Sequence, residues 1–228
     1  MLADADLAAI GRALGDSHRA RFILALLGGG ELPAGELAAR AGTSSSLTSA
    51  HLARLLESGL VTVETRGRQR YYKIASAQVA ASIEALLTIA PQRAASSLRD
   101  ATRGTSLQRA RTCYDHLAGQ LGVALADALE RDRVLVPAAG GWDLTSVGRR
   151  RLEALGLDPE ALQQTRRPLL RPCLDWTERR PHLAGALGRA LADRLLDLGW
   201  VRRSTHSRAI VITAPGQQQL LAEFAIKI

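Results

Sequence analysis

The chain has 228 residues, 46% of them hydrophobic and 23% charged, a composition that excludes intrinsic disorder and leaves room for one large core or two small ones. Lysine and arginine number 30 against 22 aspartate and glutamate residues, which gives a net charge of +8. This excess favours an anionic partner, such as a nucleic-acid backbone or an anionic membrane surface.

The N-terminal segment MLADADLAAI has acidic residues where a secretory signal peptide needs basic ones. It is not followed by an apolar run of the roughly 18 residues that a membrane span requires. We therefore expect a cytoplasmic protein with no membrane partner. In that compartment its two cysteines are expected to be reduced thiols and not a permanent disulfide.

Apolar residues at three- and four-residue spacing predict two short helices between residues 7 and 27, the second capped by Asp16 or Ser17. Three consecutive glycines interrupt the chain, and a brief amphipathic helix is predicted over residues 33–42. A longer helix is predicted in TSSSLTSAHLARLLESGLV, ending at Gly59.

This longer helix carries short hydroxyl side chains and an arginine, which suit contacts with phosphates and base edges in a major groove. The residues concerned are Ser44, Ser45, Ser46, Thr48, Ser49 and Arg54. Serine and threonine are also common helix caps, so the helix alone leaves capping and DNA contact equally open.

The next segment, LVTVETRGRQRYYKI, alternates apolar and polar residues on both sides of Gly67, which predicts a β-hairpin. Its basic residues are Arg66, Arg68, Arg70 and Lys73. Against the single acid Glu64 they leave a net charge of +3 in a short ribbon. A basic ribbon that follows a helix-turn-helix pattern indicates a wing that contacts DNA phosphates.

From residue 7 to residue 88 the chain resembles the winged-helix repressors of the ArsR/SmtB type. The motifs that carry the resemblance are ALGDSHRARFILALL, GELAARAGTSSSLTSAHLARLLESGLV and TRGRQRYYKI. The resemblance implies a homodimer that binds a palindromic operator, with two recognition helices in successive major grooves of double-stranded DNA. It also implies that His51 lies on or beside the recognition surface, with the hydroxyl residues named above.

The chain departs from that family in two places. Metal-sensing members commonly carry Cys-x-Cys in the helix before the recognition helix, whereas this chain has ELPAGELAAR there, so the arsenic-type metal site is absent. Plain members tend to end after one dimerisation helix, which corresponds here to residues 76–88, but this chain continues for well over a hundred residues.

Residues 91–110 are rich in arginine, serine and small side chains, and we expect a helical linker or a basic arm there. The predicted organisation is therefore a DNA-binding and dimerisation domain over residues 1–90, this linker, and a C-terminal effector or assembly domain over residues 111–228.

The C-terminal domain contains one plan twice, over residues 111–156 and 171–226. Each copy begins with Arg-x-Cys-x-Asp, continues with HLAGxLGxALAD, and then runs strand, turn, strand, Thr, Gly and an apolar helix. The pattern predicts a duplicated helix–hairpin–helix domain, similar to a winged helix, whose halves pack together because each is too small to bury a core alone. We expect the two glycine-bearing helices to cross each other closely.

Both cysteines stand in this repeated phrase, beside carboxylates, imidazoles and a tryptophan. The candidate effector or metal residues are Cys113, Asp115, His116, Cys173, Asp175, Trp176 and His182. Thiol, carboxylate and imidazole groups are ligands for zinc, nickel or cobalt. The cysteines also suit a reversible disulfide, and Trp142 and Trp176 suit the walls of a pocket for an organic effector. Simple packing, with the two aspartates as helix caps, explains the same residues without any ligand.

The sequence thus predicts a mainly α-helical protein with small β-hairpins, in which a winged helix-turn-helix precedes a duplicated domain. The predicted function is a sequence-specific transcriptional repressor whose operator affinity is modulated through the C-terminal domain; the sequence requires no cofactor. The alternatives are a non-specific architectural DNA-binding protein and a thiol-dependent enzyme on a DNA-binding tether. The enzyme is not expected, because no nucleophile elbow or oxyanion signal accompanies the cysteines.

Overall fold

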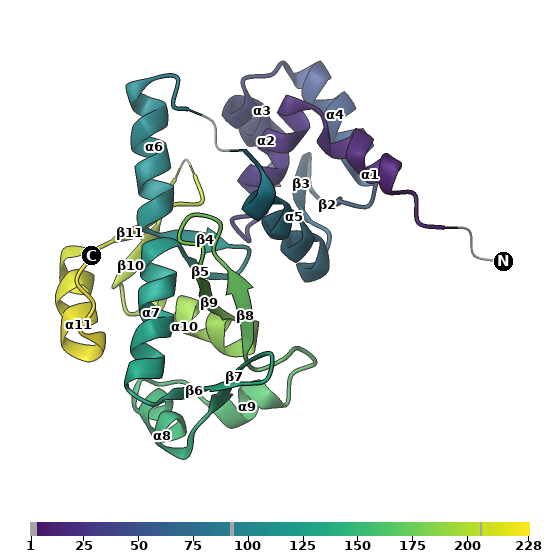
Figure 1. Cartoon of the computed structure of the whole chain (residues 1–228). Helices are drawn as coiled ribbons and strands as arrows, with labels where there is room; N and C mark the ends of the chain where they lie inside the picture. The colour runs from purple at the N-terminus through teal and green to yellow at the C-terminus, as the bar shows by residue number, and fades with distance from the viewer. Residues whose placement is uncertain (1–3, 92–93, 206) are drawn as a thin grey trace. The chain divides into compact units, whose positions relative to one another are not determined.

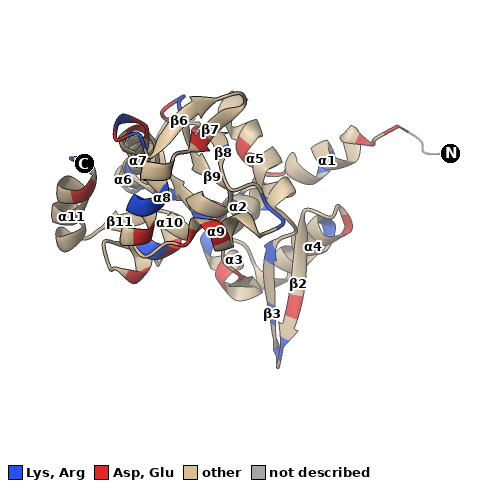
Figure 2. Ribbon diagram, turned by 90° about the horizontal axis from the view of Figure 1, so that it is seen from below, with Lys and Arg blue, Asp and Glu red and all other residues tan. Residues whose placement is uncertain are grey.

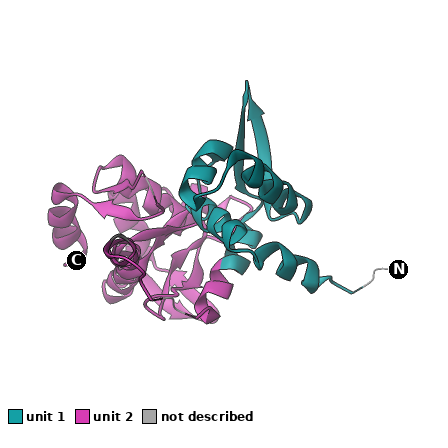
Figure 3. Ribbon diagram, turned by 90° about the horizontal axis from the view of Figure 1, so that it is seen from above, with its two compact units in different colours: residues 1–83 teal, residues 84–228 magenta. Residues whose placement is uncertain are grey.

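The computed structural model describes residues 4–91, 94–205 and 207–228. The chain divides into two compact units, residues 1–83 and 84–228, which Figure 3 distinguishes by colour. The division falls inside one helix, α5 (Ala77–Ile89). Over the described residues, no helix combines the length and the apolar character that a bilayer crossing requires.

The first unit is a winged helix-turn-helix, as predicted. Before α5 it contains α1 (Leu7–Leu14), α2 (Ser17–Leu26), β1 (Leu32–Pro33), α3 (Ala34–Ala41), α4 (Ser45–Glu57), β2 (Val61–Arg66) and β3 (Gln69–Ile74). The strands form an antiparallel sheet in the order β1-β3-β2, and β2 and β3 make the predicted hairpin (Figure 1). The Asp16 carboxylate caps α2 by accepting from the backbone N–H groups of His18 and Arg19.

The core of the first unit explains why the recognition element is held rigidly. Its fully buried apolar side chains come from three helices and are Phe22, Ile23, Leu26, Leu27, Leu37, Leu52 and Leu55. Tyr72 of β3 is also buried, so the wing is attached to the same core as α4. The helix and the hairpin tip are therefore presented from one scaffold.

The second unit repeats one order of elements. Its first half contains α6 (Leu98–Arg109), β4 (Arg111–Cys113), β5 (His116–Ala118), α7 (Gly119–Arg131), β6 (Leu135–Ala138), β7 (Gly141–Leu144) and α8 (Ser146–Ala154). Its second half contains α9 (Pro159–Gln163), β8 (Arg171–Leu174), β9 (Pro181–Ala184), α10 (Gly185–Asp197), β10 (Val201–Arg203), β11 (Ile210–Ile212) and α11 (Ala214–Phe224). Each half thus runs hairpin, helix, hairpin, helix, which supports the duplicated plan inferred from the sequence.

The segment expected to be a linker or arm includes α6, which packs on α7 and belongs to the second unit. Gln92 and Arg93 of that segment lie outside the described residues.

The glycines of the repeated phrase do not serve the helix crossing that the sequence suggested. A Cβ atom on Gly122 would lie 2.5 Å from the Leu117 carbonyl oxygen, and one on Gly188 would lie 2.3 Å from that of Leu183. Each glycine therefore lets its helix approach the strand just before it. In turn α7 packs on β9 and α10 packs on β5, so each helix covers a hairpin strand of the other half. The two helices were expected to cross each other closely; instead, each of them packs on a hairpin of the other half.

A second pair of glycines has equivalent roles in the two halves. Thr213 caps α11 by accepting from the Gly216 N–H, and Thr145 caps α8 by accepting from the Gly148 N–H. A Cβ atom on Gly216 would lie 1.9 Å from the Trp200 carbonyl oxygen. Only glycine fits there, because the opposing atom is backbone.

Gly216→Ala is therefore expected to lower the free energy of unfolding of the second unit by about 1–3 kcal/mol or more, the usual effect of overpacking. Gly104→Ala in α6 is the matched control, since no atom lies within 4 Å of its added Cβ. In a helix this control should be neutral or stabilising by about 0.5–1 kcal/mol. Urea unfolding followed by circular dichroism measures both; equal stability of the two variants would contradict the packing described.

Candidate DNA interface and Cys–His centre

The N-terminal turns of α4 present a polar surface, as the DNA interface requires. Ser44 caps the helix by accepting from the Leu47 N–H. Ser45, Ser46, Ser49 and Arg54 are all exposed on α4. If α4 entered a major groove, these exposed side chains would face base edges and phosphates.

Two of the predicted contact residues are placed differently. Thr48 is 1% exposed, and its hydroxyl lies 2.7 Å from that of Thr43. His51 is 8% exposed, and its Nδ1 lies 3.3 Å from the guanidinium of Arg19. The expectation that Thr48 and His51 face DNA is therefore corrected: both lie on the inner face of α4, because each is four residues before a fully buried leucine, Leu52 or Leu55.

The wing carries basic residues around its tip, which Figure 2 shows in blue. Arg66 is compensated, because its Nη2 lies 2.5 Å from a Glu31 carboxylate oxygen and 2.8 Å from one of Glu64. Arg68 and Arg70 are exposed, and within the described part of the chain neither has a carboxylate at ion-pair distance. Glu31 was missed from the sequence because it lies far from the hairpin along the chain.

In the second unit, the hairpins β4–β5 and β8–β9 each place a cysteine opposite a histidine. The register pairs Cys113 with His116 and Cys173 with His182. Side chains of directly paired residues lie on the same face of a hairpin, so each hairpin offers one sulfur and one imidazole together. The six extra residues between Cys173 and His182 fall in the loop that joins β8 and β9, and leave this pairing unchanged.

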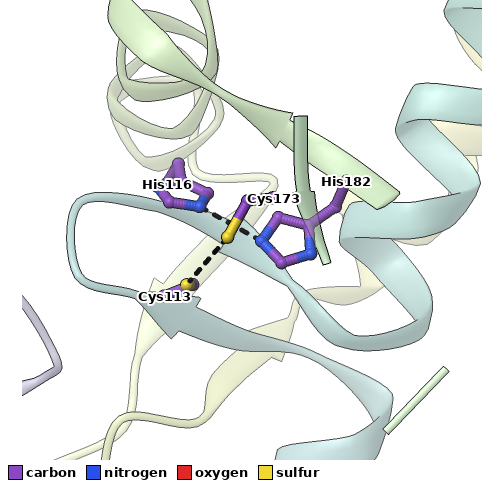
Figure 4. A group of neighbouring side chains, drawn as sticks. All are labelled: Cys113, His116, Cys173 and His182. Carbon is purple, nitrogen blue, oxygen red and sulfur yellow. Dashed lines mark hydrogen bonds between the residues drawn. The ribbon is translucent and has the colours of Figure 1, made fainter. Parts of the chain in front are cut away.

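The two hairpins bring the four side chains to one point, as Figure 4 shows. The Cys113 and Cys173 Sγ atoms lie 3.7 Å apart, and the Nε2 atoms of His116 and His182 lie 3.1 Å apart. One donor atom from each residue lies within 4.8 Å of all the others. Cys113 and both histidines are buried, and Cys173 is half-buried. We call this cluster the Cys–His centre.

The two aspartates of the repeated phrase contact the outer nitrogens of the histidines. Asp115 Oδ1 lies 3.2 Å from His116 Nδ1, and Asp175 Oδ2 lies 3.2 Å from His182 Nδ1. The aspartates were predicted as ligands or helix caps. Asp115 instead shares a hydrogen bond with the His116 imidazole, whereas Asp175 lies at ion-pair distance from His182 and closes a turn that is not helical.

Asp175 also joins the two halves of the unit. It is fully buried, and its carboxylate accepts from Arg111 Nη2 at 2.8 Å and from the Gly119 N–H at 2.7 Å. The Thr177 hydroxyl donates to the same carboxylate at 2.6 Å. Arg111, which is also fully buried, stacks over the Trp176 ring at 4.6 Å. Arg111 was not singled out as a site residue, although its place in the repeated Arg-x-Cys-x-Asp phrase marked it.

The contacts of the centre shift its pKa values in opposite directions. The hydrogen bond with Cys113, together with hydrogen bonds to the two histidines, lowers the pKa of Cys173 more than burial raises it. The hydrogen bond with Cys173 and burial both raise the pKa of Cys113. Burial lowers the pKa of His182, but Asp175 and Cys173 outweigh burial and raise it overall. Burial raises the pKa of Asp175, but His182 and Arg111 outweigh burial and lower it. These shifts favour an anionic sulfur within the thiol pair and an ionised Asp175.

Trp142 and Trp176, the predicted walls of an effector pocket, contact different partners. The Trp142 indole N–H donates to Glu130, whereas Trp176 lies against Arg111. One surface pocket in the described part of this unit is lined by other residues, which include Arg109, Asp127 and Arg180. The geometry of the Cys–His centre suits two chemistries: four soft or borderline ligands for a metal ion, or a pair of thiols in contact with each other.

Comparison with known proteins covers both units. Residues 14–64 match a family model described as a helix-turn-helix domain. An uncharacterised HTH-type transcriptional regulator, YdfF of Bacillus subtilis, is 41% identical over 223 residues, which are 98% of this chain and 99% of the relative. The HTH-type transcriptional regulator CmtR of Mycobacterium bovis is 41% identical over 83 residues, 36% of this chain and 70% of that protein.

Among solved structures, the homodimeric winged helix-turn-helix DNA-binding domain Mb0332 from Mycobacterium bovis, described as a possible ArsR-family regulator, is 32% identical to this chain. The match covers 39% of this chain and 88% of that domain, with a TM-score of 0.31.

Proposed function

Because the chain belongs to the HTH-type transcriptional regulators with an ArsR-type winged helix, we propose that it is a dimeric, sequence-specific repressor whose operator affinity is set by the state of the Cys–His centre. One observation carries the proposal: the chain joins a unit with an exposed recognition helix and a basic wing to a second unit that contains a largely buried cluster of two cysteines and two histidines. The family resemblance supports the dimer, since two recognition helices then read two half-sites.

A buried ion pair offers a physical route from the centre to the DNA-binding unit. Arg208 pairs with Glu84 of α5, and both side chains are about 5% exposed or less. The Arg208 carbonyl oxygen accepts from the Thr112 N–H at 2.9 Å, and Thr112 precedes Cys113 in β4. A change at Cys113 therefore reaches α5 through Thr112 and Arg208. Since α5 begins in the first unit, its position is suited to set the spacing of two recognition helices.

The thiol-dependent enzyme gains no support from the geometry. The two sulfurs and two Nε2 atoms face one another, which favours a binding centre over a nucleophile aimed at a substrate. The architectural alternative is tested directly: the purified chain should bind its own upstream DNA at least a thousandfold more tightly than a shuffled duplex. Equal affinities for the two duplexes would support non-specific binding and overturn the repressor.

The wing arginines should differ in their effects on DNA binding. Changing both Arg68 and Arg70 to alanine removes two exposed charges, so the slope of log K against log salt should become shallower by about 1.8, or about 0.9 for each phosphate that is no longer neutralised. Arg66→Ala is the matched control and should change the slope less, because Glu31 and Glu64 already compensate that charge. Fluorescence anisotropy at several salt concentrations measures the slopes; a double variant with the original slope would show that the wing does not touch phosphates.

A further inference from the structure

We infer that Cys113, His116, Cys173 and His182 form a closed, four-coordinate site for a divalent transition-metal ion of the zinc type. The inference deepens the proposed function by naming the ligand of the centre; only the effect of the ion on DNA rests on that function. The donor set comes from the second unit of the chain, in β4, β5, β8 and β9, and not from the helix before the recognition helix.

The spacing of the donor atoms fits a tetrahedron around one ion. With metal–sulfur bonds of about 2.3 Å and metal–nitrogen bonds of about 2.0 Å, tetrahedral angles place two sulfurs about 3.8 Å apart and two nitrogens about 3.3 Å apart. The Cys113 and Cys173 sulfurs are 3.7 Å apart, and the His116 and His182 Nε2 atoms are 3.1 Å apart. Both like pairs therefore already have the separations that an ion would impose.

The aspartates orient the imidazoles toward the ion. Asp115 can accept from Nδ1–H of His116, and Asp175 lies 3.2 Å from Nδ1 of His182, so both carboxylates favour a proton on Nδ1 and a lone pair of Nε2 turned to the centre. When neither Nε2 atom carries a proton, two lone pairs 3.1 Å apart in a buried site repel unless a metal ion lies between them. A carboxylate behind a histidine ligand is the usual second contact in zinc sites, where it fixes the tautomer and strengthens the ligand.

Ligand type and burial select the class of ion and the role of the site. Two thiolates and two imidazoles favour zinc, or cobalt in its place, over the hard ions magnesium and calcium, which prefer oxygen ligands. All four positions of a tetrahedron are filled by protein, as in structural zinc sites and unlike catalytic ones, which keep a position open. Because each hairpin supplies one sulfur and one nitrogen, the ion would clamp the two halves of the unit together.

The test is metal uptake by the reduced, chelator-treated full chain. Cobalt should bind with one ion per chain and give the intense visible bands of tetrahedral thiolate coordination, and zinc should displace it and raise the thermal unfolding midpoint. Cys113→Ser should abolish the cobalt–thiolate bands. His18→Gln is the discriminating control, because Asp16, His18 and His51 also lie close together in the first unit. Loss of uptake in His18→Gln, with normal uptake in Cys113→Ser, would overturn the site.

A milder variant keeps the test valid if Cys113→Ser folds poorly. Asp115→Asn leaves all four ligands in place and should weaken zinc binding by about 10- to 100-fold through the orientation of His116, although it also removes the ion pair with Arg167. An unchanged zinc affinity would show that Asp115 does not orient His116 toward a metal ion. If the chain instead takes up no metal, and thiol titration shows both cysteines consumed on mild oxidation, the centre is a disulfide pair and the metal inference is wrong. None of these measurements uses DNA, so failure of the operator hypothesis leaves them unaffected.

Discussion

Asp175→Ala is expected to destabilise the second unit by about 3–5 kcal/mol, the effect of removing one partner from a buried ion pair. The carboxylate is fully buried, so its loss leaves the Arg111 guanidinium charged and without its anion inside the unit. It also removes the acceptors of the Gly119 N–H and the Thr177 hydroxyl, which hold α7 and the β8–β9 turn. Because Arg111 and Asp175 come from different halves, the two halves should separate more readily.

Chemical unfolding in the presence of a chelator measures this effect apart from any metal at His182. Asp193→Ala is the matched control: Asp193 lies 3.5 Å from Arg189 on an exposed face of α10, and such pairs contribute at most about 1 kcal/mol. An Asp175→Ala variant as stable as the Asp193→Ala control would mean that the Arg111 charge is relieved in some other way, and the account of how the halves join would be wrong.

Arg208→Met is expected to be similarly destabilising, by about 3–5 kcal/mol, because it leaves Glu84 as a buried carboxylate without its cation. The double variant Glu84→Leu with Arg208→Met should recover much of that loss, since replacing a buried ion pair by apolar side chains of similar volume is often neutral or better. The free energies of unfolding of the single and the double variant, each compared with that of the parent chain, measure the loss and its recovery.

The double variant also tests the route to α5. It keeps the Cys–His centre and the recognition helix intact, but it removes the ion pair that connects β4 to α5 through Thr112 and Arg208. It should therefore still bind the metal and the operator, but metal binding should change its operator affinity less than it does in the parent chain. A double variant that responds to metal as the parent does would show that the coupling runs elsewhere.

The first unit could be predicted from the sequence because its signals are local. The cap at Asp16, the hydroxyl residues before α4 and the glycine at the hairpin tip each act within a few residues of the chain, and the structure has an element at each place. What could not be predicted was which hydroxyl residues face outward. Thr48 is turned inward by the helical period, toward a core formed by residues distant in sequence.

In the second unit, the repeated phrase was sufficient to identify the four residues of the Cys–His centre. It was not sufficient to assign the roles of the residues around them. Cys113, His116, Cys173 and His182 were all selected from the repeat, and the structure brings their donor atoms together. The pairs Arg111–Asp175 and Glu84–Arg208 join residues more than sixty positions apart, and a single sequence carries no signal for them. The role of Gly122 and Gly188 was misassigned for a different reason: the group nearest each is a carbonyl of the strand just before its own helix, and not the other helix.

If the Cys–His centre controls operator affinity, loading it with metal must change that affinity. The affinity of the reduced protein for its upstream DNA is measured with zinc and after chelation, for the parent chain and for Cys113→Ser. We predict a change of tenfold or more in the parent, which corresponds to about 1.4 kcal/mol of coupling, and no change in the variant. Equal affinities of the metal-loaded and metal-free parent, with loading verified on the same samples, would contradict the claim.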